Sequence, residues 1–181
     1  MLVRNHWRCL AFLAALWAVV PAGAQARDQD AEAAAAVQTH LGLFLALENR
    51  RESNEGVTRS GERLEIWFLR PIGPDGRDDA LCAGSRWLLT GRLSTTRGAR
   101  GLFEALPDLQ EVALVFYRLE TQVKPDAEGR YTQTRDASPE ARFTISREKA
   151  MQLDPAVLRG TLVGSGCASA GPALLDGVWT P

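Results

Sequence analysis

The spacing of apolar positions changes several times along the chain, and each spacing predicts an element. Residues 29–52 carry apolar side chains at helical intervals, at Val37, Leu41, Phe44 and Leu45. Asp28, Asp30 and Glu32 lie at the start of this stretch and Arg50 and Arg51 at its end, which suits the two ends of a helix dipole. We therefore predict one helix over 29–52, closed by Gly56, that packs on a sheet or, as the alternative, against a partner protein.

In residues 61–71, side chains of different character alternate with a period of two. One face of this stretch carries Leu64, Ile66 and Phe68, and the other carries Glu65 and Trp67. Such alternation is typical of a half-buried strand, which Pro71 would end.

Residues 72–84 are rich in proline, glycine and aspartate, and predict a loop that leads to Cys82. The aspartates of this segment miss the spacing of a calcium-binding loop, so we expect them to be solvated. Residues 85–93 then predict a second strand, with a helix as the alternative because Leu88 interrupts the alternation.

The central third of the chain contains the clearest strand pattern. Residues 94–108 combine capping residues with a short apolar group and predict a short helix. Residues 111–135 predict a long hairpin, because an apolar central strand is followed by a turn and by the alternating return strand 131–135. After another turn, residues 141–145 predict one more short strand.

The last third of the chain returns to a helical period. Ser146 is placed to cap one short helix, and Asp154 with Pro155 to begin another, which Gly164 would end. A further helix could begin at Cys167. The complete order predicts an α+β fold, in which the N-terminal helix packs on a mainly antiparallel sheet of four to five strands, followed by short C-terminal helices.

The N-terminus resembles a secretory signal peptide. A basic start precedes the apolar run from Cys9 to Val20, and the small residues of "AGAQA" follow it. The run is shorter than the roughly 20 residues that a membrane-spanning helix needs. We predict a signal peptide over residues 1–26, cleaved after Ala24 or Ala26, with an uncleaved anchor as the alternative, and a single domain over 27–181. This places the mature protein in the periplasm or outside the cell.

The charge of the chain bears on its partners. Removing residues 1–26 leaves 19 basic and 22 acidic residues, a net charge of −3. A nucleic-acid-binding protein would normally carry a clustered basic excess, so we predict no nucleic-acid partner.

Two cysteines remain after cleavage, Cys82 and Cys167. An even number of cysteines in an oxidising compartment predicts a disulfide. The alternative, a catalytic Cys167 thiolate, needs a nearby base, and His40 is the one histidine left.

The same shortage of histidine argues against other catalytic and metal sites. Ser165 in "VGSGC" lacks the first glycine of a nucleophile elbow and would also depend on His40. We expect no zinc site and predict neither a metal nor a cofactor.

One anion-binding site is suggested by the sequence. The predicted helix over 94–108 would present free N–H groups at its start, where Arg97 and Arg100 could add forked donors. A solvated basic turn is the alternative, since the chain has no phosphate-binding loop.

Export and the lack of a catalytic set favour a non-enzymatic binding or accessory module of the cell envelope, whose partner would be a protein or another envelope component. One alternative is a hydrolase or transferase that uses carboxylates such as Glu65, Glu104 and Glu120. Another is a secreted enzyme inhibitor, with the loop 72–85 as its wedge.

Overall fold

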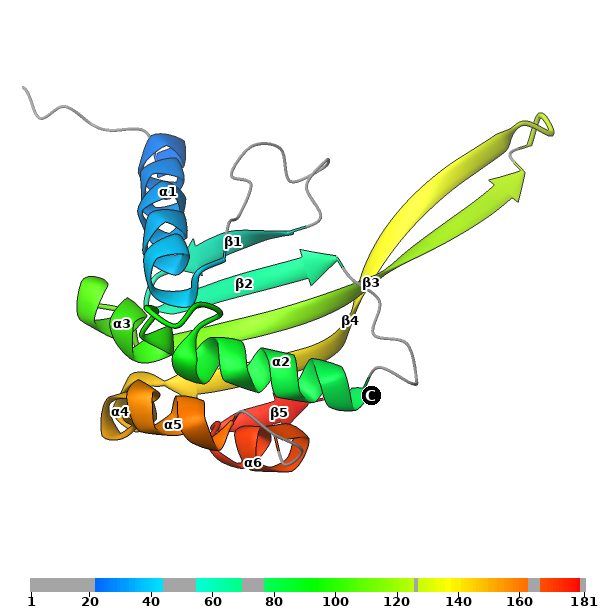
Figure 1. The fold of residues 1–181 in the computed structure, drawn as a ribbon. Helices are drawn as coiled ribbons and strands as arrows, with labels where there is room; N and C mark the ends of the chain where they lie inside the picture. Colours follow the sequence, from blue (N-terminus) through cyan, green and yellow to red (C-terminus); the bar gives the residue numbers. More distant parts are fainter. Residues whose placement is uncertain (1–21, 44–54, 70–76, 126, 163–166, 180–181) are drawn as a thin grey trace, which may run out of the picture.

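The computed structural model describes residues 22–43, 55–69, 77–125, 127–162 and 167–179. Figure 1 shows its elements in chain order: α1 (Ala22–Leu41), β1 (Glu55–Ser60), β2 (Arg63–Leu69), α2 (Arg77–Thr90), α3 (Gly98–Ala105), β3 (Glu111–Pro125), β4 (Tyr131–Ser146), α4 (Arg147–Gln152), α5 (Pro155–Thr161), α6 (Cys167–Ala173) and β5 (Gly177–Trp179).

The described strands form one sheet in the order β1-β2-β3-β4-β5. β2 and β3 pair in parallel, and the other neighbours are antiparallel. Parallel neighbours need a long crossover, which α2 and α3 supply between β2 and β3. The predicted α+β fold with a mainly antiparallel sheet is confirmed, while the extent of the domain over 27–181 stays a prediction.

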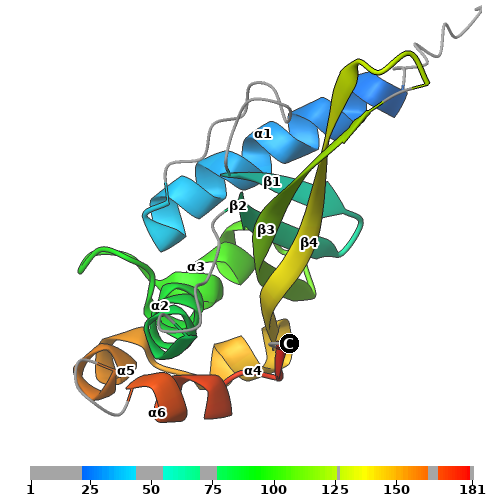
Figure 2. The ribbon, with the colours of Figure 1, turned by 90° about the vertical axis from the view of Figure 1, so that its right-hand side faces the viewer.

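The hydrophobic core lies between the sheet and the helices. Figure 2 shows the helices gathered on one side of the strands. Alternate strand residues point to that side and are buried, at Leu64, Ile66, Phe68, Val112, Leu114, Phe116, Ala141, Phe143 and Ile145. The Phe116 ring stacks on Phe68 at 5.5 Å between centroids and meets Phe143 edge-on at 6.0 Å. We call this side of the sheet the covered face.

The first helix differs from its prediction at both ends. α1 begins at Ala22, inside the predicted signal peptide, and ends at Leu41 instead of residue 52. Gly42 ends it, because its φ of 68° is a left-handed conformation that glycine adopts without strain and its N–H bonds the carbonyl of Gln38. The predicted closure at Gly56 is therefore wrong, since Gly56 lies in β1. Residues 44–52 of the prediction lie outside the described residues.

The segment predicted as a loop and then a strand is largely the helix α2. Asp78 and Asp79 lie in its first turn, where negative charge is favourable, so the predicted loop is wrong from Arg77 onward. Both aspartates are nevertheless exposed to solvent, as expected. The predicted strand 85–93 is also wrong. Leu88 and Leu89 continue a buried helical stripe from Gly84 and Ser85, and the uninterrupted apolar run suits a helix packed on a sheet. Asp75 lies outside the described residues.

The predicted hairpin is longer than expected, because 131–135 and 141–145 belong to one continuous strand. A β-bulge between Phe116 and Tyr117 accommodates the segment predicted as a turn: Tyr117 pairs with Pro139 and Phe116 with Ala141. Beyond the bulge, 118–125 and 131–138 continue as a two-stranded ribbon that we call the arm.

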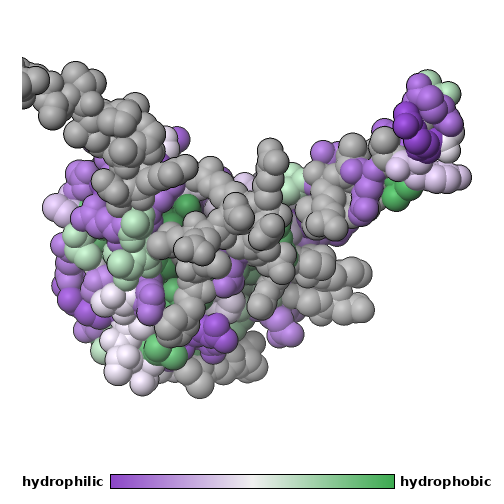
Figure 3. Space-filling view, turned by 90° about the horizontal axis from the view of Figure 1, so that it is seen from above, coloured by the Kyte–Doolittle hydropathy of each residue, from purple (hydrophilic) through white to green (hydrophobic). Residues whose placement is uncertain are grey.

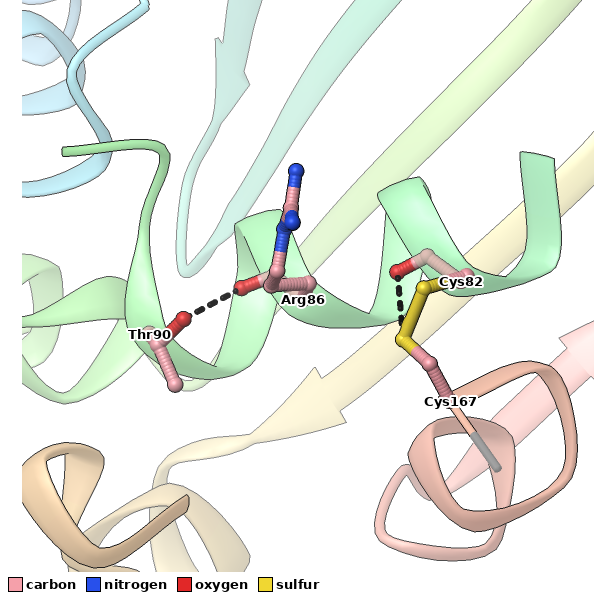
Figure 4. The surroundings of a disulfide bond; sticks show 4 residues. All are labelled: Cys82, Arg86, Thr90 and Cys167. Atoms are coloured by element: carbon pink, nitrogen blue, oxygen red, sulfur yellow. Dashed lines mark hydrogen bonds between the residues drawn. A yellow bond between two sulfur atoms is a disulfide. The ribbon is translucent and has the colours of Figure 1, made fainter. Parts of the chain in front are cut away.

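The disulfide is confirmed, and it joins two helices. Cys82 of α2 and Cys167 of α6 are bonded, with Cα atoms 4.9 Å apart (Figure 4). The close approach is possible because a Cβ on Gly171 would lie 2.6 Å from the Cβ of Ser85, so only glycine fits between these helices. Cys167 Sγ also lies 3.5 Å from the carbonyl oxygen of Cys82, a contact without a proton to donate because the sulfur is bonded.

The predicted starts of the two short helices in the last third are confirmed, whereas the second helix ends at Thr161, before the predicted stop at Gly164. Ser146 Oγ accepts the N–H of Lys149 at the start of α4, and Asp154 caps α5 with Pro155 in its first turn. The helix predicted from Cys167 is α6, whereas the short strands β1 and β5 were not predicted. Gly164 and Ser165 lie outside the described residues.

Candidate functional site

The side of the sheet opposite the core carries polar and aromatic side chains, and none of the described helices covers it. The registers place five of these residues on that side, which we call the open face: Glu65, Trp67, Tyr117, Arg142 and Trp179. Ala113 and Val115 also belong to this side, but they are buried between the larger side chains of β2 and β4. On the open face, large polar and aromatic side chains therefore surround two small, buried apolar side chains.

Glu65 is the centre of a hydrogen-bonded set on the open face. The Tyr117 hydroxyl donates to Glu65 Oε1 at 3.1 Å, and Arg142 Nη1 donates to Glu65 Oε2 at 2.9 Å. Burial, followed by the neighbouring Glu65 carboxylate, raises the pKa of the Tyr117 phenol, so the hydroxyl keeps its proton. The set has no net charge, since the carboxylate neutralises the guanidinium.

Trp67 lies flat across the neighbouring strand. Its register partner is Gly56, and a Cβ at Gly56 would lie 2.3 Å from the indole ring, so the ring occupies the space of the missing side chain. A shallow pocket of about 330 Å³ adjoins the ring, lined by Thr58, Glu65, Trp67, Leu69, Tyr117 and Ala137. This pocket connects the open face to the base of the arm.

The arm continues the open face away from the body of the molecule. Because alternate residues of a strand share a face, Val123 and Pro125 lie on the same side as Tyr117, and Tyr131 is the register partner of Pro125. Val123 is 58% and Tyr131 78% exposed. Figure 3 shows the arm standing clear of the body, with hydrophobic residues among mainly hydrophilic ones.

The root of the arm is fixed at the bulge. Arg118 pairs there with Glu140, whose carboxylate is only 7% exposed. Beyond this pair, the described residues of β2 and β5 do not pair with the arm, since β2 ends opposite Tyr117 and β5 pairs with Arg142 to Thr144. A two-stranded ribbon is marginally stable in water, so the arm has less support than the rest of the sheet.

The predicted anion site lies on the other side of the molecule. Arg97 directly precedes α3, and Arg100 is in its first turn. Both guanidinium groups contact Glu104: Arg97 Nη1 lies 2.5 Å from Oε2, and Arg100 Nε 3.3 Å from Oε1. The structure thus brings the two arginines together, but it adds a carboxylate that the sequence did not associate with them.

A third arginine, Arg159 of α5, reaches the same place. Its guanidinium donates to the carbonyl oxygens of Ser94, Thr90 at 2.9 Å and Thr96 at 2.7 Å. A pocket of about 360 Å³ lies between these groups, lined by Ser94, Thr96, Arg97, Arg100, Asp154, Pro155, Ala156 and Arg159. We call it the arginine pocket.

His40 is half-buried at the end of α1, and its carbonyl oxygen accepts the N–H of Arg97. A Cβ at Gly101 would lie 2.5 Å from His40 Nδ1, so the imidazole packs against α3. Burial and then the positive charge of Arg97 lower the pKa of His40, although Glu104 acts in the opposite direction.

Of the three acidic residues in the hydrolase hypothesis, Glu65 and Glu104 do not form a pair. Glu65 bonds with residues of β3 and β4, whereas Glu104 bonds with Arg97 and Arg100. The side chain of Glu120 lies outside the described part. The inhibitor hypothesis assigned the inhibitory contact to a loop over 72–85. From Arg77 onward, this segment is the helix α2 instead.

The described ranges contain neither a metal-binding cluster nor a membrane-spanning helix. There, no three His, Cys, Asp or Glu side chains come together as a metal site. No helix in the same ranges has both the length and the apolar character to cross a membrane.

The open face was missed as a site because its residues are distant in sequence. Tyr117 and Arg142 follow Glu65 by 52 and 77 residues, and only the strand registers bring them together. The available signal was the alternation that placed Glu65 and Trp67 opposite the core residues of β2. No protein-family model, curated protein or solved structure matches this chain.

Proposed function

We propose that the protein is an exported, non-enzymatic binding module of the cell envelope, and that it binds a protein partner through the open face and the arm. The observation that carries this proposal is a sheet whose described helices all lie on one side, while the other side displays Trp67, Tyr117, Arg142 and Trp179. Tryptophan, tyrosine and arginine are the residue types that dominate the energetics of protein interfaces.

The shape of the surface favours a protein over a small molecule. Small-molecule sites are concave and bury most of the ligand, whereas the pocket beside Trp67 is shallow and the surface continues onto the arm. Each strand of the arm adds roughly 25 Å at about 3.3 Å per residue, a length that suits a macromolecular partner.

The charges of the open face suit a partner without strong net charge there. Glu65 and Arg142 already neutralise each other, so binding need not supply a counter-ion for either. The exposed Val123 and Tyr131 of the arm provide apolar contact area at the far end of the surface.

Export is supported by the signal-like residues 1–26 and by the disulfide, since disulfides persist mainly outside the cytoplasm. Mass spectrometry of the protein from its host tests this part. We expect a mature N-terminus at Gln25 or Arg27, and an intact Met1 would contradict cleavage.

Binding is tested by capture of the tagged full-length protein from envelope extracts after reversible crosslinking. Two substitutions on the proposed surface, Trp67→Ala and Val123→Ser, are compared with Val157→Ser. Val157 is a matched control, because it is 66% exposed but belongs to α5 on the covered side.

We expect one protein species to be retained by the wild type and by Val157→Ser, and to be lost from Trp67→Ala and Val123→Ser. Equal retention by all four proteins would place the interface elsewhere. Capture of nothing above background would contradict the proposal as a whole.

A further inference from the structure

We infer that the arginine pocket is a second binding site, independent of the open face, and that it takes a small oxyanion: a phosphate or carboxylate group. Arg97 directly precedes α3, Arg100 lies in α3, and Arg159 lies in α5. All three line one pocket of about 360 Å³. Guanidinium groups present paired N–H donors that match two oxygens of such an anion.

The charges around the pocket leave an excess of positive charge. Three guanidinium groups are opposed by two carboxylates, Glu104 beside the pocket and Asp154 in its lining. Asp154 Oδ1 already accepts the N–H of Ala156 as the cap of α5. Arg159 bonds carbonyl oxygens, and no carboxylate in the described ranges pairs with it.

Each guanidinium also retains donors. A guanidinium has five N–H donors. In each of the three arginines, the described acceptors bond with fewer than five of them. Arg159 donates to three carbonyls, and Arg100 donates to Glu104 and, through Nη1, to the carbonyl of Leu153 at 3.1 Å. The remaining N–H groups are the ones that an anion would use.

The arginines are held in position before any ligand arrives. The three carbonyl bonds fix Arg159, and Glu104 and Leu153 fix Arg100, so little side-chain entropy would be lost on binding. Arg97 and Arg100 together already bind one carboxylate, that of Glu104, so their donors can be shared by a single oxyanion.

The test is a titration of the full chain with inorganic phosphate and with acetate, followed by NMR, at an ionic strength held constant with chloride. The variants Arg97→Gln and Glu104→Gln change the net charge of the pocket in opposite directions, since the first removes a positive charge and the second a negative one. Arg63→Gln is the matched control, because Arg63 is 74% exposed, forms an ion pair with Glu111, and belongs to β2.

We expect saturable shifts of the amides around the pocket in the wild type and in Arg63→Gln. Affinity should fall about tenfold in Arg97→Gln, which loses charge-assisted donors, and rise in Glu104→Gln, which frees two guanidiniums. Saturation by phosphate alone identifies a phosphate-type ligand, and saturation by acetate alone a carboxylate.

Two results would overturn the inference. One is the absence of saturation by either anion in both the wild type and Glu104→Gln, which would make the three arginines structural only. The other is unchanged affinity in Arg97→Gln. Arg159→Gln is avoided as the main variant, because loss of its three carbonyl bonds could unfold the protein.

Discussion

The two faces of the sheet differ in what they contribute. The covered face places Leu64, Ile66 and Phe68 of β2 against the helices, and each of these is at most 3% exposed. The intervening residues of the same strand, Glu65 and Trp67, are half-buried and face away from the helices. One strand thus supplies hydrophobic stabilisation on one side and a polar, aromatic surface on the other.

This difference separates folding from binding. Side chains of the covered face lose all contact with water, so their removal should affect mainly the free energy of unfolding. Side chains of the open face lie at the surface, so their removal should affect mainly the proposed interaction. The predictions below compare the two faces, from the largest expected effect to the smallest.

The largest effect is expected at Phe143, which is fully buried on the covered face and packs against Phe116. Phe143→Ala should lower the free energy of unfolding by about 3–5 kcal/mol, from lost burial and the cavity left behind. Trp67→Ala on the open face should cost clearly less, because the indole is already partly in water. Urea unfolding followed by circular dichroism measures both, and equal losses would contradict the distinction between the faces.

The disulfide between α2 and α6 should be the next most important contribution. Cys82→Ser with Cys167→Ser frees a loop of 85 residues, and we expect a loss of about 2–5 kcal/mol in the free energy of unfolding. Thiol titration of the mature protein in denaturant provides the control, with no free thiol expected. One or two thiols per chain would show that the bridge does not form.

The ion pair of the open face should contribute little to stability. Glu65→Gln removes its charge from Arg142 in a partly solvated position, so the free energy of unfolding should change by less than about 1 kcal/mol. Retention of the captured partner should nevertheless fall. A large loss of stability with unchanged retention would assign Glu65 to folding instead.

The smallest effect concerns pH. Burial and Arg97 lower the pKa of His40 in the folded protein, so the unfolded chain binds more protons just below the ordinary histidine value of about 6.5. The contribution of His40 to the free energy of unfolding should therefore be fully present above that value, and it should be lost as the pH falls below it. His40→Gln should flatten this part of the profile of midpoint against pH, and an unchanged slope would show that His40 does not titrate differently on folding.

The sequence predicted those elements whose pattern is local. The period of two in β2, the apolar run of β3 and the caps at Ser146 and Asp154 each depend on neighbouring residues, and all were confirmed. The disulfide was predicted by counting the cysteines of a chain that is itself only predicted to be exported.

The missed elements depend on contacts that are distant in sequence. β1 is a mainly polar edge strand, and the Asp30 carboxylate of α1 accepts the N–H of Arg59 within it. The helix α2 has an apolar run whose period is ambiguous until it packs on the sheet. The arginine pocket was half predicted, since Arg97 and Arg100 were recognised but Arg159 approaches only through the fold.

The central claim is that the open face and the arm bind a protein partner. Amide hydrogen exchange of the protein, alone and with the captured partner, tests it most directly. We predict new protection in the arm, at 118–125 and 131–138, whose two strands pair only with each other among the described strands. Protection confined to α2, α5 and α6, with the arm exchanging as fast as before, would contradict the account.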